Sequence, residues 1–401
     1  MIRGVRMGKK YLFIGWYPNP VEQYKNVFFQ NLVFALSDAG NDCTVISPVS
    51  YMRYTKKITI IPKETYQITP GNTKVKVYYP RVFSASSKQI GSFNTEIITE
   101  KWFEDGALRI AKKLNREKEC FDAVYGHFFL YGGLAAIKIG RFLNIPSFVA
   151  FGECDYESQV QATYGDLKIK DIEGLSGVIS VSTKNAKKLD ELGIFGNIPK
   201  IIAPNAVDHN LFKKLNKEAC RKKFGLPLDK LIVGFVGGFI ERKGDKRLLE
   251  AVNQIEDVYL AYAGVGNEPP SGARVLFCKP LRHEEVPVLL NAIDIFCLPT
   301  LSEGSCNAVA EALSCGVPVI SSNLEFNDDV LNDSNSIRIN PNSVDEIKDA
   351  INLLKNDREI RNSIAKAGYA RAQTLAIEQR AKIIADFMEN VIYKKETVKL
   401  E

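Results

Sequence analysis

The stretch Leu298-Pro-Thr-Leu-Ser-Glu-Gly-Ser-Cys-Asn-Ala-Val-Ala-Glu-Ala-Leu313 places two glutamates, Glu303 and Glu311, eight residues apart across a loop that turns into a helix. The apolar run Ile293–Leu298 before it predicts a short buried strand, and Val317–Ser321 after it predicts the next strand. The order strand, loop, helix, strand is typical of a parallel sheet. It places the loop at the carboxyl edge of that sheet.

This loop is a candidate anion site. We expect Asn307 to cap the helix and Gly316 to end it. The free N–H groups and the positive end of the helix dipole at such a turn favour an anion such as phosphate. Glu311, one turn inside the helix, could then accept two hydrogen bonds from a ribose diol, which suits a nucleotide diphosphate whose sugar faces Glu303. The spacing alone is equally compatible with two solvated acids at a helix start.

A second loop, Val236-Gly-Gly-Phe-Ile-Glu-Arg-Lys-Gly244, also lies between a predicted strand and a predicted helix. Gly237 and Gly238 permit close backbone approach, and Lys243 is expected to reach a diphosphate held by the Glu303 loop. A Gly-Gly turn followed by a lysine is commonplace in isolation. Its occurrence together with the Glu303 loop favours one shared anion site.

His127 follows the predicted strand Phe121–Tyr125, at the expected carboxyl edge of the first sheet. A lone histidine is more often a structural residue, but a position at the mouth of an interdomain cleft favours a function. The three histidines and eight cysteines have no metal-ligand spacing and no C-x-x-C pair, so we expect no metal site.

Predicted strands and helices alternate along the 401 residues, which indicates an α/β protein with two Rossmann-like domains. The first domain is expected over residues 1–204 and the second over 229–376. Turn-forming residues and a charged stretch mark 205–228 as the hinge. Residues 377–401 are predicted to form an amphipathic helix.

Composition and charge limit the class of protein. The chain is 45% hydrophobic and 25% charged, as in soluble globular proteins, and has neither a signal peptide nor a bilayer-spanning run, so we expect a cytoplasmic location. Residues 1–200 hold 27 Lys and Arg against 19 Asp and Glu, whereas 201–401 hold 26 against 28. A basic first half attracts anionic lipid or an acidic acceptor, although an ordinary lysine surface explains the same charge. No aromatic-basic pattern indicates nucleic acid.

Five motifs together resemble the GT4 family of bacterial retaining glycosyltransferases, which have the GT-B fold, over nearly the whole chain. They are Ile202-Ala-Pro-Asn-Ala-Val-Asp208, Phe235-Val-Gly-Gly-Phe-Ile-Glu-Arg-Lys-Gly244, Asp294-Ile-Phe-Cys-Leu-Pro299, the E-x7-E run of Glu303 and Glu311, and Ala312-Leu-Ser-Cys-Gly-Val-Pro-Val-Ile320.

The resemblance implies a role for each candidate residue. Lys243 matches the lysine that stabilises the donor diphosphate, and Glu311 matches the glutamate that binds the ribose hydroxyls. Glu303 matches the first glutamate of the pair, close to the transferred sugar, and His127 matches a histidine that contacts the sugar near its reacting carbon. The loop whose amides touch sugar and phosphate corresponds to Gly304, Ser305, Cys306, Asn307 and Ala308.

The resemblance also implies two Rossmann-like domains facing across a cleft, with the acceptor on the N-terminal domain and the donor on the C-terminal one. The helix 377–401 is expected to return to the N-terminal domain. Three positions depart from the family pattern. Gly238 stands where an arginine is common, for which Arg242 is a candidate substitute. The hinge glycine is Ala206, and Asn26 stands where many members carry a glycine before the first helix.

We therefore expect a retaining glycosyltransferase that moves a sugar, from a UDP-sugar or similar donor, to an acceptor in cell-surface polysaccharide or glycolipid synthesis. It is expected to need no metal or cofactor and to work in the cytoplasm, at the inner face of the membrane. Two alternatives remain: a GT-B enzyme with a soluble small-molecule acceptor, and a non-catalytic sugar-nucleotide-binding subunit. A nicotinamide-dependent oxidoreductase is disfavoured because both domains lack the dinucleotide-binding glycine fingerprint.

Overall fold

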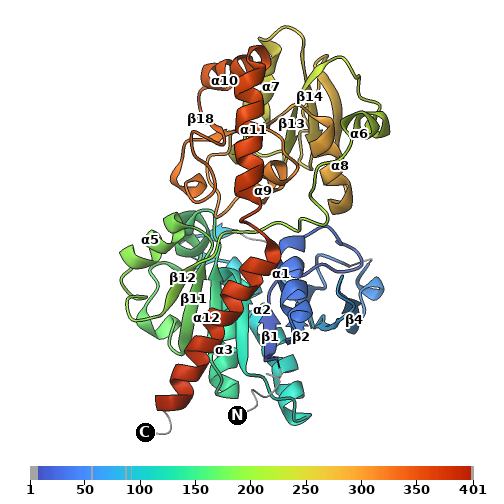
Figure 1. Cartoon of the computed structure of the whole chain (residues 1–401). Coiled ribbons are helices and arrows are strands. Elements are labelled where there is room, and N and C mark those ends of the chain that lie inside the picture. The colour runs from blue at the N-terminus through green and yellow to red at the C-terminus, as the bar shows by residue number, and fades with distance from the viewer. Residues whose placement is uncertain (1–7, 56, 86–87, 92, 399–401) are drawn as a thin grey trace, which may run out of the picture. The chain divides into compact units, whose positions relative to one another are not determined.

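The computed structural model describes residues 8–55, 57–85, 88–91 and 93–398 (Figure 1). These residues form two compact units. Unit 1 runs up to Ala203 and also contains the chain from Glu378 onward, and unit 2 spans Pro204–Ile377. Each unit is built around its own sheet, as the sequence predicts for an α/β protein with two Rossmann-like bodies.

The main sheet of unit 1 has the strand order β12-β11-β10-β9-β1-β2-β5-β4. All neighbours are parallel except β4, which runs antiparallel to β5. The central strands β9 and β10 are buried along their whole length, as expected when helices cover both faces of a sheet. The strands of the sheet are β1 (Lys10–Ile14), β2 (Asp42–Ile46), β4 (Glu64–Ile68), β5 (Lys74–Tyr78), β9 (Ala123–His127), β10 (Ser147–Phe151), β11 (Leu175–Ser180) and β12 (Lys200–Ile202).

Among the described residues, two short strand pairs and six α-helices accompany the sheet of unit 1. The pairs are β3 (Val49–Ser50) with β6 (Arg81–Val82), and β7 (Gln89–Ile90) with β8 (Phe93–Asn94). The helices are α1 (Val27–Asp38), α2 (Glu96–Arg116), α3 (Leu134–Leu143), α4 (Ala162–Tyr164), α5 (Thr183–Glu191) and α12 (Ile377–Val398).

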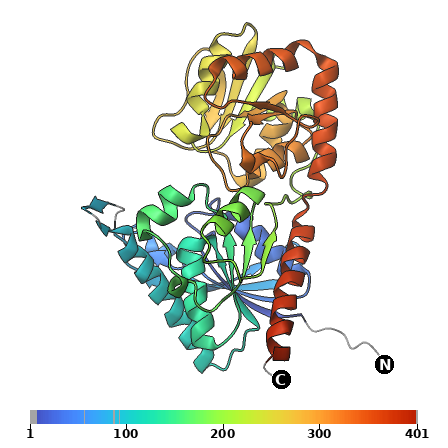
Figure 2. The same ribbon diagram turned by 90° about the vertical axis from the view of Figure 1, so that its left-hand side faces the viewer.

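Helix α12, the last element of the chain, packs against unit 1 (Figure 2). Its Phe387 ring meets the Phe148 ring of β10 at 5.9 Å between centroids. The Arg380 guanidinium is buried and its Nε donates to the Ala203 carbonyl at 3.2 Å. The chain therefore leaves unit 1, builds unit 2 and returns, as the GT-B resemblance implies.

The sheet of unit 2 has the order β15-β14-β13-β16-β17-β18, and all neighbours are parallel. Its strands are β13 (Leu231–Val236), β14 (Val258–Ala263), β15 (Val275–Lys279), β16 (Ile295–Leu298), β17 (Val319–Ser322) and β18 (Ile337–Ile339). Its helices are α6 (Lys217–Phe224), α7 (Asp245–Asn253), α8 (Val286–Ala292), α9 (Asn307–Ser314), α10 (Val344–Asn356) and α11 (Arg358–Ala372).

In each sheet the strand order reverses at one place, between β1 and β9 in unit 1 and between β13 and β16 in unit 2. The loops that leave the carboxyl ends of two such strands diverge to opposite sides, and ligands of open α/β sheets bind in the crevice left between them. Ligand sites are therefore expected at the carboxyl ends of these two strand pairs.

Two local predictions were wrong. His127 is the last residue of β9 instead of following its strand, because the parallel pairing with β10 extends to Ala150 opposite His127. Asn307 is the first residue of α9 instead of its cap, because Cys306 holds the extended backbone (φ −83°, ψ 104°) of the N-cap position. In the described part of the chain, no helix has both the length and the apolar character to cross a membrane.

Candidate functional site

The two loops predicted to share an anion do lie together, at the reversal point of unit 2. One follows β13 and the other follows β16, and the Leu301 N–H donates to the Arg242 carbonyl at 2.8 Å. Gly244 ends the first loop in a left-handed conformation (φ +79°), and a Cβ there would lie 2.5 Å from the Pro299 carbonyl oxygen. Glycine at this position is thus required for the close approach of the two loops.

Glu303 is the centre of this contact. Its Oε1 lies 2.5 Å from Lys243 Nζ and 3.0 Å from Arg242 Nη1, and it accepts a hydrogen bond from Thr300 Oγ1 at 2.9 Å. Arg242 also donates to the Ser302 carbonyl. The Arg242 side chain therefore points toward the two loops and pairs with the same carboxylate, that of Glu303, as Lys243 does.

The cluster keeps an excess of positive charge. Burial acts to lower the pKa of Lys243, but the neighbouring Cys306 and Glu303 raise it, and the net shift is upward. The ammonium therefore stays protonated well above neutral pH. Two cations against one carboxylate, close to the N-terminus of α9, favour an anionic ligand.

Glu311 lies in the second turn of α9 and is half-buried. Burial raises the pKa of its carboxyl to about 7. Within the described residues its side chain makes no hydrogen bond or ion pair. At the start of the same helix, the buried Asn307 Oδ1 also has no hydrogen-bond partner. Two polar groups of α9 are thus available to a ligand.

The remaining loop residues divide into open positions and anchored ones. A Cβ on Gly237 or Gly238 would meet nothing closer than 3.5 Å, so packing does not require glycine at either position. Ser305 is anchored, since its Oγ accepts from the Asn205 N–H and its carbonyl accepts from Asn205 Nδ2, both at 3.1 Å. Gly304 and Cys306 are buried, and Ala308 is half-buried in the first turn of α9.

His127 belongs to unit 1, so it is not part of the cluster in unit 2. It lies at the carboxyl end of β9, at the reversal point of its own sheet. The ring stacks on Phe29 at 4.2 Å between centroids and meets Phe128 edge-on at 4.9 Å. Burial, and then the nearby Arg380, hold its pKa well below the usual range, so the imidazole is neutral at physiological pH.

Sequence reasoning missed three residues of the two sites. Arg242 was only a candidate substitute, Asn205 was assigned to a hinge, and Thr300 was not considered. Asn205 carried a signal, because it lies in the Pro-Asn motif of the family resemblance. Thr300 carried none, because nothing in the sequence shows that it contacts the carboxylate three residues later. No cluster of three His, Cys, Asp or Glu suited to a metal ion occurs in the described ranges.

Residues 216–371, which contain Arg242, Lys243, Glu303 and Glu311, match the family model described as "Glycosyl transferases group 1". This segment is a group 1 glycosyltransferase domain. The resemblance to the family is confirmed, and the group 1 domain coincides with most of unit 2.

A relative and two solved structures extend the likeness beyond the group 1 domain. The chain is 26% identical to the glycosyltransferase TuaC of Bacillus subtilis (strain 168), named for teichuronic acid biosynthesis, over 89% of this chain and 92% of that protein. Sucrose-phosphate synthase from Thermosynechococcus elongatus superposes with a TM-score of 0.75 at 18% identity, covering 96% of this chain and 100% of that one. Anabaena HepE in complex with UDP-glucose superposes with a TM-score of 0.68 at 16% identity, covering 95% of this chain and 100% of that one. These structures confirm the predicted GT-B fold.

Proposed function

We propose that this glycosyltransferase moves a sugar from a nucleotide diphosphate sugar to a growing cell-surface polysaccharide or glycolipid, with retention of anomeric configuration and without a metal or cofactor. The observation that supports this most directly is the Lys243–Glu303–Arg242 cluster at the reversal point of the group 1 domain. The proposed acceptor class agrees with the name of the Bacillus subtilis relative, and a UDP-sugar donor agrees with the UDP-glucose bound to Anabaena HepE.

The proposed chemistry follows from the leaving group. When the bond between the sugar and the nucleoside diphosphate breaks, negative charge grows on the β-phosphate. The balancing positive charge would come from Lys243 and from the backbone amides of Asn307 and Ala308 at the start of α9. We also propose that the phosphates occupy the open space beside Gly237 and Gly238. Glu311 would hold the ribose, Glu303 would lie beside the transferred sugar, and the neutral His127 of unit 1 would contact that sugar near its reacting carbon.

Ligand-induced stabilisation of the purified protein tests donor binding. A ligand at a hundred times its dissociation constant adds about 2.7 kcal/mol to the free energy of unfolding. We expect one family among UDP-, GDP-, ADP- and dTDP-sugars to raise Tm selectively, and a response to none of them would contradict the proposed donor site. Transfer to saccharide acceptors that persists in EDTA, with a retained anomeric signal in the NMR spectrum, tests the reaction. Binding without transfer to any acceptor would favour a sugar-nucleotide-binding subunit.

The proposed ribose contact makes donor affinity depend on pH. The pKa of Glu311 is raised to about 7 by burial, so the carboxylate that accepts from the ribose diol forms as the pH rises through 7. About one-tenth of the groups are ionised at pH 6 and nine-tenths at pH 8, so the affinity should rise up to about tenfold between them.

The measurement is isothermal titration with the nucleotide sugar that gives the largest Tm shift. Glu311→Gln removes the titrating group, and we expect it to bind about ten- to hundredfold more weakly than the ionised wild type, because hydrogen bonds to a charged group contribute about 1.5–3 kcal/mol. Its affinity should be the same at pH 6 and pH 8. An equal pH response in wild type and variant would show that another group titrates.

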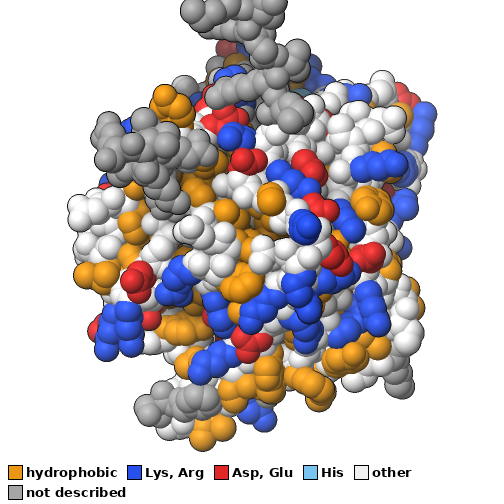
Figure 3. All heavy atoms as spheres, turned by 90° about the horizontal axis from the view of Figure 1, so that it is seen from below, with side chains coloured by type: hydrophobic (Ala, Val, Ile, Leu, Met, Phe, Trp, Pro, Cys, Tyr) orange, Lys and Arg blue, Asp and Glu red, His pale blue; other side chains and the backbone are white. Residues whose placement is uncertain are grey.

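We further propose that unit 1 contacts an anionic membrane surface. Residues 51–118 hold 14 Lys and Arg against 6 Asp and Glu, more than the whole net charge of the chain. In the view of Figure 3, Lys and Arg side chains form a band with hydrophobic side chains among them. A mixed basic and apolar surface of this kind suits anionic lipid.

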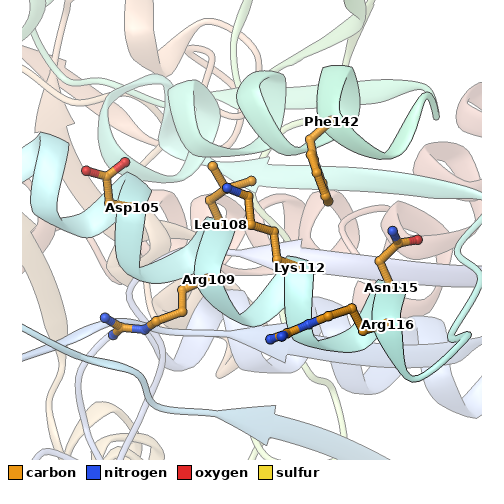
Figure 4. A pocket seen from close by; sticks show the side chains of 7 residues that line it. All are labelled: Asp105, Leu108, Arg109, Lys112, Asn115, Arg116 and Phe142. Atoms are coloured by element: carbon orange, nitrogen blue, oxygen red, sulfur yellow. The ribbon is translucent and has the colours of Figure 1, made fainter.

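One stripe of helix α2 carries both basic and aromatic side chains. The α2 stripe consists of exposed residues spaced three or four apart on one helix face: Trp102, Asp105, Arg109, Lys112 and Arg116. At one end Trp102 contacts the exposed Phe83 at 5.9 Å between ring centroids. At the other, Phe142 of α3 faces the stripe across a groove of about 590 Å³ (Figure 4). Aromatic rings with nearby cations are typical of the lipid interface.

Charge reversal on the α2 stripe tests this contact. Each Lys or Arg near an anionic bilayer contributes about 1 kcal/mol. We therefore expect Arg109→Glu with Arg116→Glu to weaken co-sedimentation with phosphatidylglycerol-containing vesicles by about thirtyfold or more. The matched control, Lys222→Glu with Lys223→Glu on the exposed face of α6 in unit 2, should bind like wild type. Equal binding to pure phosphatidylcholine vesicles, or equal loss in both variants, would contradict the proposal.

A further inference from the structure

The residues that follow His127 adopt an unusual backbone. We call Phe128–Gly133 the histidine loop. Phe128 (φ 64°) and Tyr131 (φ 59°, ψ −78°) both have a positive φ, a sparsely populated conformation that costs a non-glycine residue about 1–3 kcal/mol. A Cβ on Gly132 would lie 2.4 Å from the His127 carbonyl oxygen, so the loop folds back against the histidine backbone. Contacts elsewhere must hold a loop of this shape.

The first such contact comes from Glu153, in the loop directly after β10. Its side chain is buried, with 5% of its surface exposed. Oε1 accepts the N–H of Phe129 at 2.5 Å and that of Leu130 at 3.3 Å, and Oε2 accepts the N–H of Gly152 at 3.0 Å. One carboxylate thus satisfies two successive amides of the histidine loop and one of its own loop.

The second contact comes from Glu100 on α2, which is fully buried. Its Oε1 accepts the Tyr131 N–H at 3.0 Å, and its Oε2 accepts a hydrogen bond from the Tyr164 hydroxyl. Glu153 and Glu100 therefore bind three consecutive amides, those of residues 129, 130 and 131. Two elements far apart in sequence converge on these amides.

Neither carboxylate has a salt bridge to a lysine, arginine or histidine of the described chain. Burial raises the pKa of Glu100 to about 8 and that of Glu153 to about 7, and the hydrogen bonds from the loop amides oppose this rise because they favour the ionised form. For Glu153 the hydrogen bonds in the structure all come from backbone N–H groups, and two of the three belong to the histidine loop. These contacts indicate that the role of Glu153 is to hold the histidine loop in place.

The backbone that carries Glu153 is itself fixed. The Asn185 side chain on α5 is buried, and its Nδ2 donates to the Glu153 carbonyl at 3.0 Å and to the Phe151 carbonyl at 3.4 Å. Glu153 therefore connects the histidine loop to a rigid helix. A carboxylate held in this way restrains the atoms that it binds more tightly than a side chain on a free loop.

We propose that Glu153 and Glu100 are positioning residues, which hold the histidine loop and thereby fix His127 for sugar transfer. The inference rests on the proposed function, because it assigns a reaction to His127. Neither acid touches the sugar in this scheme. Both act through the backbone directly after the histidine, and a displacement of about 1 Å at a reacting group can cost about a hundredfold in rate.

Glutamine variants test the proposal by kinetics. Glu153→Gln keeps one acceptor oxygen, but its NH2 group must face an N–H donor, either that of Gly152 or those of Phe129 and Leu130, so at least one of the three hydrogen bonds is lost. We expect Glu153→Gln and Glu100→Gln to lower kcat by about ten- to hundredfold, with an unchanged nucleotide dissociation constant, because the donor cluster lies in unit 2. Glu153→Asp, which keeps a carboxyl group, should recover part of the rate.

The matched control is Glu104→Gln, one turn along α2 from Glu100. Glu104 is also a shielded acid, but it pairs with Lys138 at 3.1 Å and does not contact the histidine loop. We expect it to retain the wild-type kcat. Hydrogen exchange of the peptide covering residues 128–133 should accelerate in the two loop variants and stay unchanged in Glu104→Gln.

Combination with His127→Ala separates a positioning role from a general loss of structure. If Glu153 acts through His127, then Glu153→Gln should lower kcat no further once the histidine is gone. Additive losses would overturn the inference, as would a normal kcat in both glutamine variants. An unaltered chain that transfers no sugar from any nucleotide sugar would overturn the proposed function and with it this inference. Faster exchange with normal kcat would overturn the inference alone.

Discussion

Replacing Lys243 with alanine is expected to lower kcat/KM for sugar transfer by about 10²- to 10³-fold, the cost of removing one preorganised charge from a leaving oxyanion. The Lys243 side chain is half-buried and its ammonium lies 2.5 Å from Glu303, so it is fixed before any ligand arrives. In the proposed reaction it balances the charge that grows on the β-phosphate. Most of the loss should appear in kcat, because the diphosphate carries more charge in the transition state than in the bound donor.

The Lys243→Ala variant should still fold, because Glu303 keeps its contacts with Arg242 and with Thr300. Lys246→Ala is the matched control. It removes an exposed lysine from the next turn, whose ammonium pairs with Glu268, and it should leave kcat/KM unchanged. Steady-state kinetics on both variants, with circular dichroism to verify folding, decide the matter. A Lys243→Ala enzyme within threefold of wild type would remove the lysine from the proposed mechanism.

The sequence predicted the fold because periodicity and motif spacing are local signals. The predicted strands Ile293–Leu298 and Val317–Ser321 are present as β16 (Ile295–Leu298) and β17 (Val319–Ser322), since each is a short apolar run next to turn residues. The end of β9 was missed, because Gly126 and His127 interrupt the apolar pattern. Pairing with β10 decides that end, and pairing partners are not visible in one sequence.

The candidate site likewise has features that could be predicted from the sequence and features that could not. The meeting of the Lys243 and Glu303 loops could be predicted, since both follow parallel strands of one sheet and end at the same edge. The direction of Arg242 could not, because only the contact with Glu303 fixes it. The roles of Glu100 and Glu153 left no trace in the sequence. Both acids bind backbone amides, and a backbone amide has no residue identity to recognise.

The two reversal points explain why the proposed catalytic groups occupy these positions. In unit 1 the sheet reverses between β1 and β9, and His127 ends β9. In unit 2 it reverses between β13 and β16, and the loops carrying Lys243 and Glu303 follow these two strands. The loops from each pair diverge, so they leave a crevice for a ligand at the strand ends while the sheet beneath stays rigid.

Replacing Arg221 with alanine is expected to destabilise unit 2 by about 3–5 kcal/mol, the typical cost of breaking a buried ion pair by removing one partner. Only 3% of Arg221 is exposed. Its Nη2 lies 2.6 Å from Asp294 Oδ2, and its Nε donates to the Ala292 carbonyl at 2.8 Å. Its Nη1 donates to the carbonyls of Pro227 and Leu228 at 3.0 and 2.9 Å. Alanine would remove this donor from the three carbonyls, whereas Asp294 would keep its contacts with the Ile232 N–H and with Lys217.

The position of Asp294 shows why Arg221→Ala should lower stability, whereas a substitution in the Lys243–Glu303–Arg242 cluster should lower activity. The residue begins the Asp-Ile-Phe-Cys-Leu-Pro motif of the family resemblance, and its Oδ2 also accepts from the Ile232 N–H at 2.7 Å. It therefore ties the starts of β13 and β16 together, at the edge of the sheet opposite the Lys243 and Glu303 loops. The Arg221→Ala variant should unfold at lower urea concentration and yet bind the nucleotide sugar normally when folded.

The neighbouring Lys222→Ala is the matched control. Lys222 is exposed and pairs with Glu218 on the same helix, so its removal should not shift the urea midpoint measurably. Urea titrations of both variants, with and without nucleotide sugar, separate stability from binding. An unshifted midpoint for Arg221→Ala would show that water replaces the guanidinium at its acceptors. Weakened nucleotide affinity in the folded variant would instead show that strain at the amino edge of the sheet reaches the loops at its carboxyl edge.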